Sequence, residues 1–292
     1  MNIGILTRNQ NAWCSSRLKE AFHRHGVAAV CLTFHNLAGN IAAKHNVTLR
    51  RKDMLREIGA LLIRPIGRGS LEETIFRLNL LHSISRMGLP VVNTPSSIEK
   101  AVDKYYTLAL LSEAGIKVPR TVVTENVSEA LHAFRQFEGD AVVKPVFGSR
   151  GIGTARISNE DVAERAFRTL HFLKHVIYVQ EFIQHGTRDI RIFVVGTRVV
   201  AAKFRIADSW KTNVSKGAKP TPLKWTSEME ELAIKSSNTI GTEIAGIDLL
   251  ESGNELLVTE INSQPGWRGL QTTTRTNVAD EIASYMIAKA KR

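Results

Sequence analysis

The chain has few of the features that would place it in a membrane, in a secreted fold or among disulfide-rich proteins. Cys14 and Cys31 are the only cysteines in 292 residues, and neither forms a C-x-x-C pair or has metal-type spacing with histidine. A disulfide framework and a structural zinc site are therefore not expected. The longest apolar runs, such as 28–32 and 141–143, fall far short of the roughly 20 residues that span a bilayer. The first six residues read as a strand and not as a signal peptide, which predicts a cytoplasmic protein.

A surplus of positive charge is the most informative bulk property. Lysine and arginine number 39 against 28 acidic residues, for a net charge of +11, and residues 1–100 carry 14 basic against 6 acidic side chains. This excess favours an anionic partner, whether a nucleotide, a polyanionic small molecule, a nucleic acid or an acidic protein. We expect something acidic to dock on the first third of the chain.

The order of expected elements divides the chain into three parts. Alternating strands and helices predict an open parallel sheet over residues 1–95, with strands at 2–7, 28–33, 60–64 and 91–92. Residues 96–183 read as one helix over 97–114 followed by a compact αβ unit. Residues 184–292 combine strands at 190–195 and 199–204, an irregular stretch, a helix at 227–239, a hairpin and a terminal helix. No internal repeat or low-complexity linker interrupts them.

A glycine-rich loop follows a lysine in the middle part. Gly148, Gly151 and Gly153 have the order G-x-x-G-x-G, which fits neither the dinucleotide fingerprint nor the P-loop. A strand expected at 154–157 would make the loop a hairpin tip whose backbone N–H groups can fold over phosphates. Lys144, on an apolar strand before it, requires an anionic partner such as phosphate. A plain hairpin turn would also use glycines, and Lys104, on the preceding helix, is a second candidate that would otherwise be a solvated charge.

Two expected strands near the C-terminus carry a cluster of oxygen donors. Because strand side chains alternate, Glu260 and Asn262 share one face, and Asp248 lies beside them on the neighbouring strand. Two carboxylates and an amide oxygen suit Mg²⁺ or Mn²⁺ shared with nucleotide phosphates. The alternative is an acidic hairpin whose groups face water.

Between these motifs lies a third set of polar residues. Glu181 and Phe182 end an apolar strand and precede Asp189, so that this segment could offer backbone groups to an adenine and a carboxylate to a ribose. An ordinary strand end with solvated charges explains them equally well. The next strand carries Arg205, and the polar run 211–213 beyond it can reach phosphate oxygens.

In this order and spacing, the motifs from Lys104 to Asn262 resemble the ATP-grasp superfamily over residues 95–292. Residues 188–196, 211–213 and 262–266 look like the subgroup related to the ribosomal protein S6 glutamate ligase. Residues 64–71 and 102–107 are most similar to glutamate ligases that modify tetrahydromethanopterin or coenzyme F420.

The resemblance implies a fold, cofactors and residue roles. The fold is α/β, an ATP-grasp fold with an N-terminal open parallel-sheet domain, a central lid domain and a C-terminal αβ domain. The implied cofactors are ATP and two Mg²⁺ or Mn²⁺ ions, and Asp248, Glu260 and Asn262 would bind the metal. The residues assigned to ATP are Lys104, Lys144, Ser149, Gly151, Gly153, Glu181, Phe182, Asp189, Lys211, Thr212 and Asn213.

The family reaction has two steps, which the residues suit. The acceptor carboxylate attacks the γ-phosphate to give an acylphosphate, and the amine of L-glutamate then displaces phosphate. Such chemistry needs positioning and cationic stabilisation more than a protein nucleophile, and we assign Arg205 to steady the transferring group. Lys211 and Thr212 stand where the S6-ligase relatives tend to have Arg and Ser, which weakens any inference about the acceptor.

The basic first domain is expected to help bind an acidic acceptor. Arg64 and Arg68 follow a predicted strand at the edge where open α/β sheets bind ligands, and they could grip an acceptor carboxylate; the alternative is that they are surface arginines. The predicted partners are L-glutamate and a small-molecule cofactor or protein C-terminus, in a homo-oligomer. The first rival is a ligase that modifies the C-terminus of a protein such as S6 or uses another amino acid. The second is a nucleic-acid-binding module, which would bind with strong salt dependence and without ATP turnover.

Overall fold

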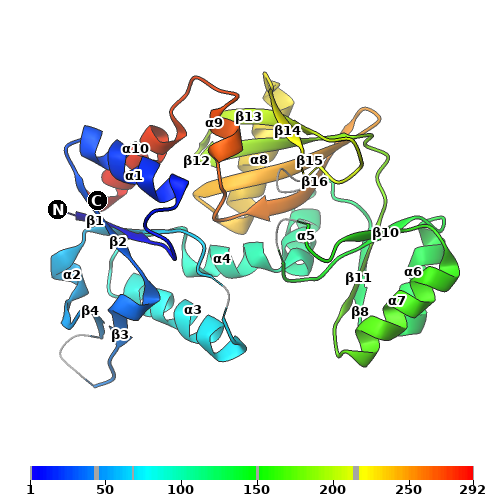
Figure 1. Ribbon diagram of the computed structural model, residues 1–292, viewed down its shortest axis with the longest axis horizontal. Helices are drawn as coiled ribbons and strands as arrows, with labels where there is room; N and C mark the ends of the chain where they lie inside the picture. Colours follow the sequence, from blue (N-terminus) through cyan, green and yellow to red (C-terminus); the bar gives the residue numbers. More distant parts are fainter. Residues whose placement is uncertain (1, 43–45, 68, 149–150, 213–216, 292) are drawn as a thin grey trace.

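The computed structural model describes residues 2–42, 46–67, 69–148, 151–212 and 217–291. Figure 1 shows three regions along the long axis, with the first strands at one end, a large sheet in the middle and a small sheet covered by helices at the other end. Each region is built around its own sheet, and the order of these sheets follows the sequence.

The N-terminal sheet is parallel, as predicted. Its order is β2-β1-β6-β7, formed by β1 (Asn2–Leu6), β2 (Ala28–Leu32), β6 (Ala60–Ile63) and β7 (Val91–Val92). The crossover helices are α1 (Trp13–Arg24) and α3 (Leu71–Arg86). Ser70 starts α3 with a capping box, because its hydroxyl accepts from Glu73 N while the Glu73 carboxylate accepts from Ser70 N.

A second, small sheet in the first third was not predicted. It consists of β3 (Leu37–Gly39), β4 (Val47–Leu49) and β5 (Lys52–Asp53), preceded by the 3₁₀ turn η1 (Phe34–Asn36) and followed by α2 (Met54–Glu57). Strands of two or three residues are too short to show an alternating pattern. Their buried side chains Leu37, Val47 and Leu49 join the core below the parallel sheet.

The single helix expected over 97–114 is wrong, since two helices occupy this stretch. The first is α4 (Pro95–Val102) and the second is α5 (Lys104–Glu113). Between them Asp103 is extended (φ −89°, ψ 106°), and its carboxylate accepts a hydrogen bond of 3.0 Å from Tyr106 N. This N-cap restarts the helix and makes Lys104 its first residue.

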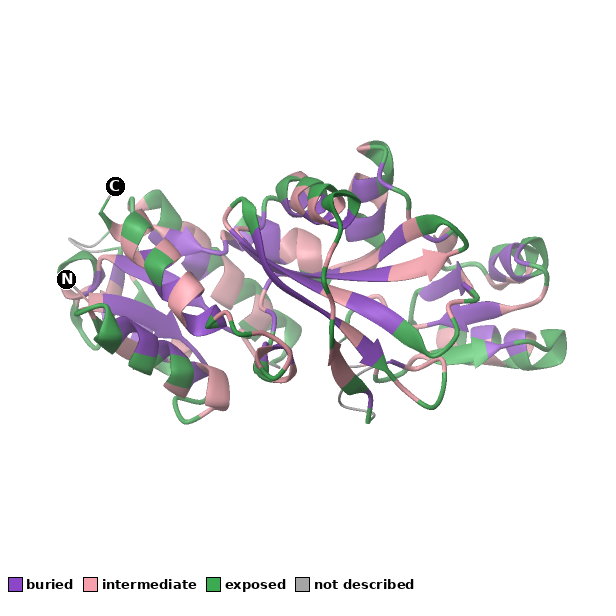
Figure 2. Cartoon of the chain, turned by 90° about the horizontal axis from the view of Figure 1, so that it is seen from above, coloured by how far each residue is buried: buried purple, intermediate pink, exposed green. Residues whose placement is uncertain are grey.

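The central sheet is antiparallel in the order β10-β9-β11-β8. Its strands are β8 (Thr121–Thr124), β9 (Ala141–Val143), β10 (Ala155–Ile157) and β11 (Ile177–Glu181). Helices α6 (Val127–Gln136) and α7 (Glu160–Phe172) cover it and bury Phe134 and Phe167. In Figure 2 buried residues line the side where these helices meet the strands, while their outer sides are exposed.

The C-terminal sheet has the order β14-β13-β12-β15-β16. Its strands are β12 (Arg188–Val195), β13 (Arg198–Ile206), β14 (Lys219–Pro222), β15 (Ile244–Ser252) and β16 (Glu255–Asn262). One face is apolar and packs against α5 and α8 (Ser227–Ile240) through residues such as Leu111, Ile192 and Ile247. The sequence predicts only an irregular stretch where β14 lies.

The last helix packs on the first one. After the short α9 (Arg268–Gln271), α10 (Val278–Ala290) joins the core of the parallel sheet, where Ile282 and Met286 share a cluster with Ile5 and Phe22. An ion pair of 2.7 Å between Arg24 and Asp280 supports this contact, and the two chain ends lie together in Figure 1. The divisions 1–95, 96–183 and 184–292 remain a prediction, although α5 and α10 bury their apolar sides outside their assigned parts.

Asn93 connects the parallel sheet to the C-terminal sheet. This fully buried side chain accepts hydrogen bonds from the backbone N–H groups of Glu243 (2.7 Å) and Ile244 (2.9 Å). Its amide donates to the carbonyls of Ile244 (2.7 Å) and Ser263. One side chain therefore satisfies four backbone groups at the start of β15 and just beyond the end of β16. In the described part of the chain, no helix is both long and apolar enough to cross a membrane.

Replacing Asn93 with alanine should lower the free energy of unfolding by about 3 kcal/mol or more, since each buried group left without a partner costs about 1–3 kcal/mol. Urea unfolding followed by circular dichroism measures this loss. The matched control is Asn79→Ala on the exposed side of α3, expected within about 0.5 kcal/mol of the parent. If the two variants are equally stable, the hydrogen bonds of Asn93 contribute little to the free energy of unfolding.

Candidate active site

The second face of the C-terminal sheet carries a row of charged side chains. The strand register pairs Lys203 with Arg191, Arg191 with Asp248, and Asp248 with Glu260. Residues paired directly across neighbouring strands point to the same face. The prediction that Asp248 lies beside Glu260 is therefore confirmed by the register. Asn262 is two residues beyond Glu260 on β16 and shares its face.

Arg205 lies at the centre of a buried network of ion pairs. It binds Asp189 through two hydrogen bonds, Nε to Oδ1 at 2.5 Å and Nη2 to Oδ2 at 2.6 Å, and its Nη2 is 3.0 Å from Oδ2 of Asp248. Arg191 also binds Asp248 through two hydrogen bonds, and Thr212 donates to Asp189. Asp189, Arg205 and Asp248 are buried, so two carboxylates and two guanidinium groups offset one another at the centre of the site.

Burial and the neighbouring charges of this network shift the pKa values of its members. Burial disfavours the Asp248 carboxylate, yet Arg191 and Arg205 lower the pKa of Asp248 below its usual value. For Asp189, burial outweighs the attraction of Arg205, and its pKa is raised. Burial also opposes the charge on Arg205, but Asp248 and Asp189 raise the pKa of its guanidinium. Arg205 therefore stays cationic.

The three predicted metal ligands supply oxygen donors of the right kind. The Glu260 carboxylate makes no hydrogen bond or ion pair with any described residue. The buried Nδ2 atom of Asn262 has no acceptor in the described part of the chain, but it is a hydrogen-bond donor and not a metal ligand. The Glu260 carboxylate, the side-chain oxygen of Asn262 and the neighbouring Asp248 carboxylate form a set of hard oxygen donors that suits Mg²⁺ or Mn²⁺. The described residues contain no group of three His, Cys, Asp or Glu side chains arranged for a metal, so any such site depends on Asn262 or on a bound ligand.

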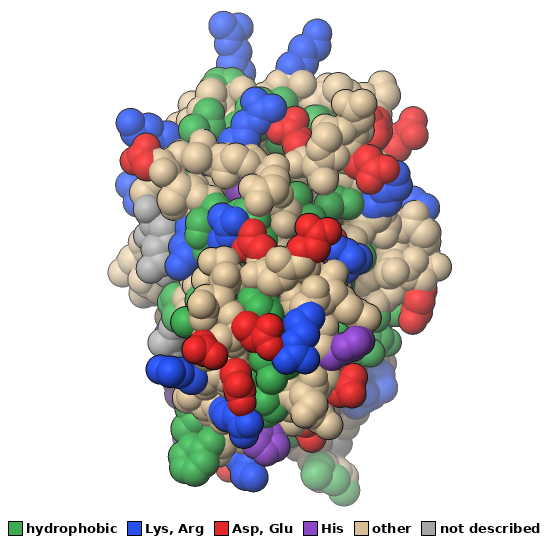
Figure 3. All heavy atoms as spheres, turned by 90° about the vertical axis from the view of Figure 1, so that its right-hand side faces the viewer, with side chains coloured by type: hydrophobic (Ala, Val, Ile, Leu, Met, Phe, Trp, Pro, Cys, Tyr) green, Lys and Arg blue, Asp and Glu red, His purple; other side chains and the backbone are tan. Residues whose placement is uncertain are grey.

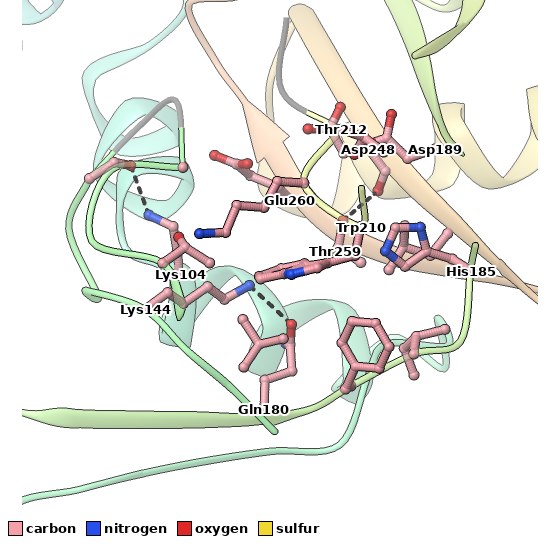
Figure 4. Close-up of a pocket in the computed structure, with 18 of the residues that line it drawn as sticks. Lys104, Lys144, Gln180, His185, Asp189, Trp210, Thr212, Asp248, Thr259 and Glu260 are labelled. Atoms are coloured by element: carbon pink, nitrogen blue, oxygen red, sulfur yellow. Dashed lines mark hydrogen bonds between the residues drawn. The ribbon is translucent and has the colours of Figure 1, made fainter. Parts of the chain in front are cut away.

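Two lysines approach the same pocket from the glycine loop and the start of α5. The Lys144 ammonium donates to Oε1 of Gln180 at 3.0 Å and lies 5.1 Å from the Tyr178 ring centroid. Lys104 donates to the carbonyl of Gly148 at 2.8 Å. Figure 4 shows both lysine side chains pointing into the pocket near Glu260. The lysines and Glu260 come from different parts of the chain. Burial lowers the pKa of Lys144 to about 8, with Glu260 opposing the shift, and it also lowers the pKa of Lys104.

The glycine loop is a hairpin tip between β9 and β10. Gly151 has φ +67° and Gly153 has φ +78°, a region that favours glycine. Gly148 and Gly151 line the pocket, whereas Gly153 lies against Pro145 and does not line it. Ser149 lies outside the described residues.

The far side of the pocket has an aromatic wall. Phe182 meets Trp210 edge to face with ring centroids 5.8 Å apart, and the Arg156 guanidinium lies 3.6 Å from the centroid of the Phe182 ring. Glu181 lines the pocket, while its carboxylate binds Arg120, with Nε to Oε2 at 2.6 Å. Lys211 and Thr212 follow Trp210 and line the pocket, and Asn213 lies outside the described residues.

The positions of Asp189 and Arg64 only partly suit the roles predicted for them. Asp189 lines the pocket but already accepts hydrogen bonds from Arg205 and Thr212, so a ribose hydroxyl would have to use its remaining lone pairs. Arg64 is buried, donates to the Pro265 carbonyl at 2.9 Å and lies 4.8 Å from the Trp267 ring centroid. It is therefore not a surface arginine, and it joins the parallel sheet to the segment after β16. Arg68 lies outside the described residues.

Several residues of the site were given no role by the sequence motifs. Trp210, Gln180 and His185 line the pocket. Lys203 is buried on the charged face without a hydrogen bond or ion pair to any described residue, and burial together with Arg191 and Arg205 lowers its pKa to about 8. Its two-residue spacing from Arg205 on a strand is the signal that could have identified it.

Comparison with known proteins gives consistent matches along the chain. A family model described as the RimK-like ATP-grasp domain matches residues 101–286, and one described as the RimK PreATP-grasp domain matches residues 1–98. A tetrahydromethanopterin:alpha-L-glutamate ligase of Methanocaldococcus jannaschii is 35% identical over 301 residues, covering 100% of both chains. A probable alpha-L-glutamate ligase 1 of Hahella chejuensis is 32% identical, covering 100% of this chain and 96% of that one.

A solved structure has the same arrangement of elements. The ATP-grasp ligase PsnB, complexed with minimal precursor, Mg and ADP, superposes with a TM-score of 0.78 over 100% of this chain and 98% of its own, at 17% identity. At that identity the likeness concerns the fold alone.

Proposed function

This chain belongs to the family of RimK-like ATP-grasp ligases, and we propose that it uses ATP to join L-glutamate to a carboxylate of an acidic acceptor. The ATP-grasp fold expected from sequence motifs is confirmed by the two family models and by the superposition on PsnB. The assignment as an ATP-dependent ligase is confirmed by the RimK-like ATP-grasp family model and by the similarity to alpha-L-glutamate ligases. The observation that carries the glutamate proposal is full-length similarity, at 30–35% identity, to alpha-L-glutamate ligases.

The pocket suits the first step, in which an acceptor carboxylate oxygen attacks the γ-phosphorus and ADP leaves. Lys104 and Lys144 line the pocket and would neutralise phosphate oxygens beside the glycine loop. Asp248, Glu260 and Asn262 would hold Mg²⁺ or Mn²⁺, two ions by analogy with the family, which would neutralise charge on the phosphates. Phe182 and Trp210 offer an apolar surface for the adenine.

In the second step the glutamate amine attacks the acyl carbon and phosphate leaves, so the acyl–phosphate bond breaks as the amide forms and the nitrogen loses a proton. Arg205 is a fixed cation next to Asp248, and we assign it to stabilise negative charge on the transferring group in both steps. Its two carboxylate partners hold the guanidinium in one orientation, so little reorganisation is needed during the reaction.

We propose a pterin- or F420-type cofactor as the acceptor. The proposal is supported by the tetrahydromethanopterin ligases among the relatives, which match nearly the whole chain, and by the basic first third. The second candidate is a protein C-terminus such as that of S6, because residues 188–196, 211–213 and 262–266 resemble the subgroup related to the S6 glutamate ligase. The nucleic-acid alternative receives no support, and Figure 3 shows acidic and basic side chains interspersed on the central-domain end.

The test is ADP release with Mg²⁺, ATP and L-glutamate, comparing a tetrahydromethanopterin or F420 acceptor with an S6 C-terminal peptide, followed by mass spectrometry of each. We expect a mass gain of one or more glutamyl residues on the cofactor. A gain on the peptide alone would replace the cofactor with a protein acceptor. Absence of ADP with every acceptor and amino acid would contradict the ligase proposal. The predicted homo-oligomer is tested separately by sedimentation velocity.

Nucleotide binding should be accompanied by proton uptake near pH 8. The Lys144 pKa of about 8 means that about half of these side chains are neutral at that pH, and a triphosphate beside the amine favours its charged form and raises the pKa. Calorimetry of a non-hydrolysable ATP analogue in buffers of different ionisation enthalpy should show uptake of about half a proton at pH 8, falling toward zero at pH 6.5.

Lys144→Met should remove most of this uptake, whereas Lys117→Met should not, because Lys117 is exposed and paired with Glu255 away from the pocket. A binding enthalpy that does not depend on the buffer at pH 8 would show that Lys144 does not meet the phosphates.

A further inference from the structure

A second pocket opens on the parallel sheet, and we call it the N-terminal pocket. It is formed at the ends of three neighbouring strands, by Leu6 to Arg8 at the end of β1, Thr33 to His35 after β2, and Pro65 with Ile66 after β6, together with Arg77 of α3. These strands are adjacent and parallel in the order β2-β1-β6, so their carboxyl ends meet at one edge. Open α/β sheets bind ligands at this edge. None of the motifs assigned to ATP or metal reaches it.

The lining of the N-terminal pocket is basic. Arg8, His35 and Arg77 line it, and no aspartate or glutamate is among its described lining residues. Arg77 is held in place by Glu73 at 3.0 Å, and its guanidinium lies 5.5 Å from the Phe34 ring centroid. By contrast, neither Arg8 nor His35 makes a side-chain hydrogen bond or ion pair with any described residue. The Arg8 guanidinium therefore brings to the pocket a charge that no acidic side chain of the described residues pairs with.

Arg8 is held against the loop that follows β6. Gly67 has φ +92°, and a Cβ atom added there would lie 2.5 Å from Cδ and 2.8 Å from Nε of Arg8. The Arg8 stem thus crosses the glycine at a distance that only glycine permits. This contact limits where the guanidinium can move and keeps it at the pocket.

The loop that lines the N-terminal pocket is bonded to the segment that follows β16. Arg64, the residue before Pro65, donates to the Pro265 carbonyl at 2.9 Å. Pro265 follows three residues after Asn262, at the end of the strand that carries Glu260. This contact joins the loop that lines the N-terminal pocket to the strand that carries Glu260.

We infer that the N-terminal pocket binds an oxyanion of the acceptor, either a phosphate ester or a second carboxylate, that is remote from the carboxylate forming the amide. Arg8 contributes the unpaired guanidinium, and His35 and Arg77 form the rest of the basic wall. Such a site gives selectivity, because an acceptor lacking this anion leaves a cationic pocket without its partner. The inference rests on the proposed ligase function for its kinetic test, but not for its binding test.

The kinetic test compares Arg8→Gln with the parent enzyme. Loss of a charged hydrogen bond to the anion should raise the KM for the acceptor about 10- to 100-fold, while kcat and the KM values for ATP and glutamate stay unchanged. The matched control, Arg17→Gln, removes an exposed arginine of α1 that pairs with Glu20 at 2.7 Å, and it should change none of these values. An unchanged acceptor KM in Arg8→Gln would overturn the inference.

The binding test needs no turnover. Inorganic phosphate and, separately, glutarate are titrated into the ADP-bound protein while the imidazole resonances are followed, with His35→Gln identifying the His35 signal. A saturable shift of that signal, lost in Arg8→Gln, is expected with the anion class that the pocket accepts, so phosphate and glutarate distinguish a phosphate ester from a carboxylate. No shift with either anion overturns the inference even if the enzyme ligates glutamate. A shift in a protein that ligates nothing overturns the proposed function and leaves the pocket in place.

Discussion

Glu260→Gln should lower ADP-forming turnover by about 10³-fold, the order expected when a fixed charge-stabilising group is lost from a phosphoryl-transfer site. Glutamine keeps the size of the side chain and one oxygen donor but removes the negative charge that a divalent cation requires. The free energy of unfolding should change by less than about 1 kcal/mol, because the Glu260 carboxylate makes no hydrogen bond or ion pair with any described residue. Steady-state ADP release and urea unfolding measure the two quantities.

Glu255→Gln is the matched control for this substitution. Glu255 lies at the start of the same strand β16, is exposed and pairs only with Lys117 among the described residues. Its loss should leave turnover unchanged and stability within about 1 kcal/mol of the parent. If Glu260→Gln is folded and as active as Glu255→Gln, the metal assignment is wrong. A shift of the Mg²⁺ or Mn²⁺ concentration required for half-maximal rate would show the effect directly.

The sequence predicts the site best where the chemistry lies within one local element. The β15–β16 hairpin was predicted with Asp248 beside Glu260 because the two-residue period of a strand fixes which side chains share a face. The parallel order of the N-terminal sheet followed from alternating strands and helices. In both cases the information is local, so a single sequence contains it.

The sequence predicts the site poorly where distant segments meet. The helix breaks at Asp103 because its side chain caps the start of α5 and its backbone is not helical. The pattern of apolar residues contains no signal for this break. The contact of α10 with α1 joins residues more than 250 positions apart and has no local signal. The sequence motifs give no role to Lys203 or Arg191, and the register alone places Arg191 beside Asp248 and Lys203 beside Arg191.

Arg205 should be the residue whose loss harms both stability and catalysis. Arg205→Ala leaves Asp189 without its guanidinium partner and Asp248 with Arg191 alone, and breaking a buried ion pair from one side costs about 3–5 kcal/mol. We therefore expect this variant to unfold at much lower urea concentration, so that its activity would not separate the two roles.

Arg205→Lys separates them. Lysine keeps the positive charge but has a single ammonium, which cannot make the paired hydrogen bonds to Asp189 and also reach Asp248 as the planar guanidinium does. It should lose about 1–3 kcal/mol of stability and remain folded at 25 °C. Its kcat should still fall about 10²- to 10³-fold, the range for removing one fixed donor to developing negative charge, with a smaller change in the KM for ATP.

Arg188→Lys is the control that gives this test its meaning. Arg188 begins the neighbouring strand β12, is exposed, and binds Glu251 at 2.8 Å on the outside of the sheet. It should lose less than about 0.5 kcal/mol and no activity. If Arg205→Lys keeps the kcat of Arg188→Lys while it is less stable, Arg205 serves to neutralise Asp189 and Asp248, and the charge on the transferring phosphoryl group must be stabilised by Lys104, Lys144 and the bound metal instead. If kcat falls in a folded protein, the guanidinium acts on the reacting atoms, since loss of stability alone does not slow a molecule that is still folded.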